Sequence, residues 1–183
     1  MYLIWEQYAD FDREVLVCLI SSLAAIYIVV LLSSGNFCSS LFVFSMMGLV
    51  DLNLVAMIWW WGLELNFITM LNVILALGLS VDYSAHITHG FNVTNASESE
   101  ATTNRERRKF KVQKSFKLMG SSVVHGAMST FLAIVMISAT TNYVFVAFFK
   151  QWFSIILFGM LHAFFLLPVL LSMCGPLSKD DLK

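Results

Sequence analysis

The sequence predicts an all-α, polytopic membrane protein with five transmembrane helices. Of its 183 residues, 58% are hydrophobic and only 13% are charged, whereas a soluble domain averages about 25% charged residues. The apolar residues gather in five runs of about 20 residues or slightly more, the length that a helix needs to cross a hydrocarbon core of roughly 30 Å. A segment inside that core must satisfy its own backbone hydrogen bonds, so we expect each run to be helical.

The N-terminal part of the chain leads into two apolar runs. Residues 1–14 combine aromatic and acidic side chains, and we expect an exoplasmic interfacial lead-in because aromatic residues favour the headgroup level. The first span is expected at 15–32, before the turn-forming residues 33–36. The second is expected at 37–61 and ends in three consecutive tryptophans, which is typical of an interfacial belt. Asp51 lies within it and either joins a polar centre, or caps a break or faces a neighbouring helix; the sequence leaves both interpretations open.

The third run, expected as a helix over 67–91, carries the ionisable residues that organise the chain. Gly78, Asp82 and His86 are spaced four residues apart and His89 follows three later, so a helix aligns them in one stripe. Ionisable groups in spanning helices are costly and usually face a bundle interior, which makes them functional-site hypotheses. Because aspartate and histidine can exchange a proton, the stripe predicts an ion or proton relay of Asp82, His86 and His89. Gly78 would support it by allowing close helix approach.

The segment 92–118 changes character because it holds seven of the eleven basic residues of the chain. These are Arg105, Arg107, Arg108, Lys109, Lys111, Lys114 and Lys117. A short basic loop is expected on the cytosolic side, which places the N-terminus outside and the tail, 174–183, in the cytosol. Glycosylation is lumenal, so we expect the sequons at Asn92 and Asn95 to stay unmodified. Residues 103–118 could also form an amphipathic helix that contacts anionic lipid, although topology explains the charges equally well.

The fourth run, expected as a helix over 121–146, opens with small residues at four-residue spacing. Ser122, Gly126 and Thr130 predict a face for close contact with another helix. His125 lies beside them and is either a relay partner for the histidines of the third run or a hydrogen-bonded packing residue; the packing interpretation is preferred.

The fifth run is expected as a helix over 151–173, with Lys150 marking the outer turn before it. His162 lies in the middle of this run, and we interpret it as structural. Pro168 follows, and a proline is tolerated in a spanning helix where neighbouring groups satisfy the freed carbonyl.

Two motifs resemble a known family. The pattern Gly78-x-x-x-Asp82 followed by Tyr-Ser-Ala-His-Ile resembles the tenth transmembrane helix of the eukaryotic Patched, Dispatched and Niemann-Pick type C branch of the RND superfamily. Residues 167–172, Leu-Pro-Val-Leu-Leu-Ser, with the Gly-Pro pair at 175–176, are similar to the end of its last helix. The five spans would then correspond to helices eight to twelve of a twelve-helix fold. The resemblance implies seven earlier helices and a large exoplasmic domain, so we expect the chain to be a C-terminal fragment.

The resemblance also implies a function. We expect the C-terminal half of a transporter that moves a sterol or another lipidic substrate, coupled to a proton or cation gradient. Asp82 would occupy the acidic position of the tenth helix, with Gly78 and His86 at the family positions before and after it, and the missing N-terminal half would be the partner. The alternative is a sterol sensor or scaffold that does not transport.

Other function classes are disfavoured. The sequence lacks a glycine-rich phosphate loop for ATP hydrolysis. The trio Asp82, His86 and His89 lacks a fourth ligand for zinc. We therefore expect no enzyme, no metal or other cofactor, and no nucleic-acid partner. The sequence does not distinguish the plasma membrane from an endomembrane.

Overall fold

The computed structural model describes residues 11–95 and 103–177, and this part of the chain is helical. The helices are α2 (Phe11–Ser34), α3 (Phe37–Trp60), α4 (Phe67–Val93), α5 (Asn104–Ser115), α6 (Ser121–Val135), α7 (Tyr143–Leu161) and α8 (Leu167–Cys174), with π turns η2 (Phe116–Gly120) and η4 (His162–Leu166) and the 3₁₀ turn η3 (Met136–Ala139). In these residues, five segments are long and apolar enough to cross a membrane. This confirms the predicted all-α, five-span class. The expected lead-in and tail fall largely outside the described residues.

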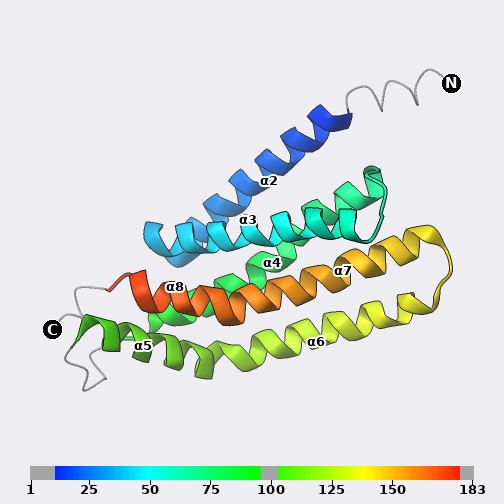
Figure 1. Cartoon of the computed structure of the whole chain (residues 1–183). Helices are drawn as coiled ribbons and strands as arrows, with labels where there is room; N and C mark the ends of the chain where they lie inside the picture. Colours follow the sequence, from blue (N-terminus) through cyan, green and yellow to red (C-terminus); the bar gives the residue numbers. More distant parts are fainter. Residues whose placement is uncertain (1–10, 96–102, 178–183) are drawn as a thin grey trace.

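The last two spans are longer than the helices named within them. Helix α5 continues through η2 into α6, and α7 continues through η4 into α8, so each set forms one rod (Figure 1). The π turn η4 ends at Leu166, two residues before Pro168. Proline has no N–H to donate and its ring crowds the preceding turn, so a widened turn at this point keeps the rod continuous.

The predicted boundaries of the fourth and fifth spans differ from the structure. The first three spans agree with prediction to within a few residues, but the fourth ends at Ala139 and α7 begins at Tyr143. Asn142 sets this start, because its Oδ1 accepts a hydrogen bond from the backbone N–H of Val144 at 3.0 Å. Lys150, predicted to mark the turn, lies inside α7 with its Nζ 5.8 Å from the ring centre of Trp61. The aromatic face of Trp61 thus accommodates the Lys150 cation within α7, whereas the sequence alone predicted a turn at this residue.

The basic segment, expected as a loop over 92–118 with an amphipathic helix over 103–118 as one interpretation, is helical over its second part. Its residues from Asn104 onward are helical, and α5 begins after Thr103, whose backbone N–H donates to Oε2 of Glu106 at 3.3 Å. Helix α5 packs against α4 and α8. The basic residues are therefore fixed on the bundle.

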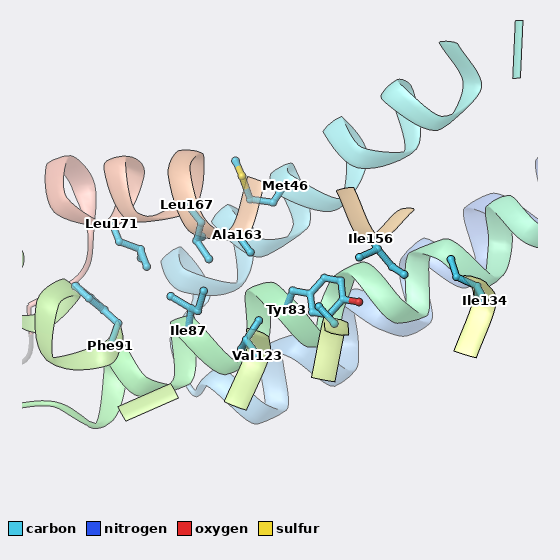
Figure 2. Close-up of a cluster of buried hydrophobic side chains, with 11 residues drawn as sticks. Met46, Tyr83, Ile87, Phe91, Val123, Ile134, Ile156, Ala163, Leu167 and Leu171 are labelled. Carbon is cyan, nitrogen blue, oxygen red and sulfur yellow. The ribbon is translucent and has the colours of Figure 1, made fainter. Parts of the chain in front are cut away.

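Helix α4 is the centre of the bundle and contacts α2, α3 and α7. It begins after Asn66, whose Oδ1 accepts from the backbone N–H groups of Ile68 and Thr69 at 3.1 and 3.0 Å. Figure 2 shows the largest core cluster, in which α4 presents Tyr83, Ile87 and Phe91 toward side chains of α6, α7 and α8. Those partners include Val123, Ile134, Ile156, Leu167 and Leu171. Such interdigitated packing is what holds spanning helices together in lipid.

Hydrogen bonds define the two ends of the bundle. At one end, the Asn92 side chain of α4 donates to Ser34 O at 3.2 Å and accepts from Ser39 Oγ at 3.0 Å. Because α5 and the end of α8 lie there too (Figure 1), we call it the α5 end. At the other end, the backbone N–H of Glu64 donates to the Tyr143 hydroxyl at 3.2 Å. This end, with the α3–α4 and α6–α7 turns, is called the Tyr143 end.

Candidate functional site

Helix α4 places Gly78, Asp82, His86 and His89 on one face, and all four residues are exposed. Three apolar residues extend the same line, and they are also exposed. We call the complete line Leu71, Leu75, Gly78, Asp82, His86, His89 and Val93 the α4 stripe. The structure thus brings the predicted relay residues together. The stripe is apolar toward the Tyr143 end and polar from the middle of the helix toward the α5 end.

The opposite face of α4 is fully covered by the other helices. Ser80, Ser84 and Ile87 are each at most 3% exposed, and Tyr83, next to Asp82, is 5% exposed. The chain's own helices therefore pack on one side of α4 and leave the ionisable side bare. Within the described residues these groups do not face a bundle interior, because spacing identifies a shared face without identifying which face is covered.

Gly78 has open space around it. A Cβ built on Gly78 would meet no atom within 4 Å, whereas one on Gly159 would lie 2.9 Å from Tyr83 Cδ2 and one on Gly90 would lie 2.8 Å from Ser115 Oγ. Gly90 and Gly159 therefore provide the close approaches of α4 to its neighbours. The surface of the α4 stripe is therefore open at Gly78, and no helix of the described chain packs there.

The structure does not bring Asp51 to the stripe. It belongs to α3, which packs on the covered side of α4, and it adjoins Val50 and Leu54 of a buried cluster with Ala76 and Ile155. Asp51 is half-buried, and its Oδ1 is buried without a hydrogen-bond partner among the described residues. Of the two interpretations left open, this placement favours the one in which Asp51 faces neighbouring helices.

The predicted residues of α6 are also outside the core. Ser122, His125 and Gly126 are exposed, and Thr130 is half-buried with its hydroxyl donating to Gly126 O at 3.0 Å. Helix α6 buries other residues, namely Val123, Ala127 and Ile134. The small-residue face thus meets no neighbouring helix of the described chain, and His125 is not packed between helices.

A buried amide pair is the main polar feature that sequence reasoning missed. Asn72 of α4 donates from Nδ2 to Oε1 of Gln151 of α7 at 2.7 Å, and Gln151 Nε2 donates to Thr69 O at 3.0 Å. Both side chains are at most 5% exposed. An amide in each of two apolar runs is a signal that could have suggested the pair, since a polar group in lipid needs a partner.

Two further observations concern the histidines and metal binding. His162 is buried, and its Nδ1 lies 2.7 Å from the accepting carbonyl oxygen of Phe158, as expected for a structural histidine. Among the described residues, no three His, Cys, Asp or Glu side chains gather as a metal site.

Comparison with known proteins identifies the family. No protein-family model matches the chain. It is 32% identical over 181 residues to NPC intracellular cholesterol transporter 1 homolog 1b of Drosophila melanogaster, which covers 97% of this chain and 14% of that protein. It is 32% identical over 174 residues to the Niemann-Pick type C1-related protein of Toxoplasma gondii, covering 94% of this chain and 14% of the relative.

A more distant relative belongs to the Patched group. Protein patched homolog 1 of Caenorhabditis elegans is 26% identical over 173 residues, covering 94% of this chain and 12% of the relative. The chain thus spans only 12 to 14% of the length of these three proteins. The matches cover nearly all of the sequence that forms the five spans and the α4 stripe. The chain is a multi-pass membrane protein that belongs to the Niemann-Pick C1 and Patched branch of the RND superfamily.

Proposed function

We propose that this chain forms one membrane half of an RND-type transporter for a sterol or another lipidic substrate, and that its α4 stripe faces a complementary half. The carrying observation is that Asp82, His86 and His89 lie exposed on a helix long and apolar enough to span a membrane. A charged side chain at a helix centre costs on the order of 3 kcal/mol on the translocon scale. A protein surface or a water-filled interface against the stripe would remove that cost.

The shape of the stripe favours contact with a second membrane half over contact with lipid. Gly78 leaves room for the backbone of a facing helix at the point where the stripe turns polar. Leu71 and Leu75 offer an apolar contact next to it. A helix laid along the stripe would pack on the apolar part and place its own polar groups opposite Asp82.

The stripe also provides a route for a proton or a cation. On a helix that rises 1.5 Å per residue, Asp82 and His89 are about 10 Å apart along the axis, with His86 between them. These groups lead from the middle of α4 toward the α5 end. A change of charge on Asp82 would alter its attraction to the facing half and so bias two packings of the halves, as alternating access requires.

The basic residues support an orientation for the proposed half. Arg105, Lys109 and Lys117 are exposed at the α5 end, and basic residues flanking spans are retained in the cytosol. We therefore place the α5 end in the cytosol, the N-terminus on the exoplasmic side and the C-terminus inside. The names of the relatives, intracellular cholesterol transporters, support a sterol as substrate.

Reconstitution tests the proposal that the stripe is half of a site. The purified chain is placed in liposomes, and transfer of a fluorescent sterol is followed with and without a pH gradient. We expect gradient-dependent transfer only when the complementary membrane half of a relative is reconstituted with it. Gradient-dependent transfer by this chain alone would contradict the shared site. Stable assembly of the two halves without any transfer would favour a sterol sensor or scaffold.

A further inference from the structure

Two open hollows flank α5. The first, of about 250 Å³, lies between α5 and α8, and the second, of about 220 Å³, lies along α5 toward η2. The first is lined by Lys109, Val112, Gln113, Pro168, Val169 and Ser172. The second is lined by Phe110, Gln113, Lys114 and Lys117. Because both include Gln113, they adjoin, and we call the two together the α5 groove.

The α5 groove is held in a fixed position. Arg108 Nη1 donates to the Met173 carbonyl at the end of α8 at 2.8 Å. Lys111 is 2% exposed, with its Nζ 5.0 Å from the ring centre of Phe91 of α4. Helix α5 is thus attached to two other spans. A ligand in the groove would therefore bind a preformed surface. It would contact α5, which packs against the covered side of α4.

The groove lies where the fourth and fifth spans reach the α5 end of the bundle. Figure 1 shows α5 continuing through η2 into α6, and Lys117 lies in η2, four residues before α6 begins at Ser121. The opposite wall, Pro168 and Val169, belongs to the last turns of the fifth span. Val169 is 51% exposed, so this wall continues onto an exposed apolar surface.

The groove is lined by positively charged side chains. Three lysines line it, and among the described residues no acidic side chain does. Lys109 and Lys117 are exposed, while Lys114 extends over the Phe110 ring at 5.9 Å. Glu106 is the acidic residue of α5, and its carboxylate accepts the Thr103 N–H at the helix start.

We propose that the α5 groove binds an anionic phospholipid of the adjacent leaflet. The phosphate lies between Lys109 and Lys117 with the Gln113 amide as a donor, and an acyl chain follows Pro168 and Val169 into the bilayer. A lipid matches both the positive charge and the apolar wall, whereas free phosphate would use only the charge. The proposal depends on the membrane placement of the chain and is independent of whether the chain transports a substrate.

The experiment compares spin-labelled phosphatidylserine with spin-labelled phosphatidylcholine in liposomes that contain the whole chain. Electron paramagnetic resonance gives the fraction of each label immobilised by protein. We expect the wild type to prefer phosphatidylserine and Lys109→Gln/Lys117→Gln to lose most of that preference, by about fivefold for each lysine removed. Lys109→Arg/Lys117→Arg, which keeps the charge, should retain it.

A matched variant separates the groove from net charge. Arg13→Gln/Arg105→Gln removes two exposed charges that lie outside the groove, and it should keep the preference. All variants change exposed side chains, and circular dichroism and gel filtration verify their folding. No preference in the wild type, or equal loss in the two glutamine variants, would overturn the proposal. Displacement of the labelled lipid by millimolar inorganic phosphate would also overturn it, since the occupant would then be free phosphate.

Discussion

Tyr83 and Gly159 lie at a close approach of α4 to α7: a Cβ on Gly159 would lie 2.9 Å from Cδ2 and 3.1 Å from Cε2 of the tyrosine ring. The ring is 5% exposed, and Figure 2 shows it within the main cluster. Asp82, one residue earlier, is exposed on the other side of α4. Adjacent residues thus divide the helix into a face fixed by its own chain and a face open to another surface.

This division predicts opposite effects at two glycines of the spanning helices. Gly159→Leu should destabilise the chain by about 1–3 kcal/mol or more, because the new side chain would displace Tyr83. Gly78→Leu should leave the stability nearly unchanged, because nothing lies within 4 Å of the new Cβ. Unfolding of the purified chain in detergent measures both. Equal destabilisation by the two substitutions would contradict the assignment of covered and open faces.

Gly78→Leu has a second expected effect. It should weaken assembly with a complementary half, because the leucine fills the place left for a facing backbone. Co-purification of the two halves measures this, and Gly48→Leu is the matched control, since Gly48 of α3 also has open space around it. Normal assembly of the Gly78 variant would argue against close contact at this position.

The buried amide pair predicts a coupled effect on stability. Asn72→Leu should cost about 1–3 kcal/mol, because it leaves the Gln151 side chain in the core without that bond. Asn72→Leu/Gln151→Leu should cost less than the sum of the single changes, since both polar groups are removed. A double-mutant cycle of detergent unfolding measures the coupling. Additive costs would show that the 2.7 Å hydrogen bond contributes no net stability.

The proposed orientation predicts that neither sequon is glycosylated. Asn92 is also engaged in hydrogen bonds to Ser34 and Ser39 at the α5 end. A flexible insert carrying a sequon after Thr141, in the α6–α7 turn, should instead be modified in microsomes. A glycan-dependent mobility shift that disappears in Asn92→Gln would reverse the orientation.

The sequence predicts the parts of this fold that depend on local rules. Apolar run length predicts five spans, because lipid leaves the backbone no partner outside its own helix. The spacing of Gly78, Asp82 and His86 predicts a common face, because every α-helix has nearly the same periodicity. The motif around Asp82 also predicts the branch of the superfamily to which the chain belongs, and the relatives support this prediction.

The remaining features depend on contacts between distant segments. The Asn72–Gln151 pair joins residues 79 positions apart, and no local pattern specifies it. The contact of Lys150 with Trp61 is also between distant residues, so its charge alone suggested a turn. The packing of α3 and α7 on α4 decides that the α4 stripe is the exposed face, and helical periodicity does not determine that packing.

The most direct test of the proposed coupling surface is sterol clearance in cells whose NPC intracellular cholesterol transporter 1 carries this chain in place of its matched segment. Asp82→Asn keeps the size of the side chain but removes its charge. Because Asp82 is exposed on the open face, we expect this variant to lose clearance at normal abundance on immunoblots. Asp51→Asn is the matched control, because it makes the same substitution in α3, which packs on the covered side of α4. This variant should keep most of the clearance. Full clearance by Asp82→Asn at normal abundance would contradict the role of the α4 stripe in coupling.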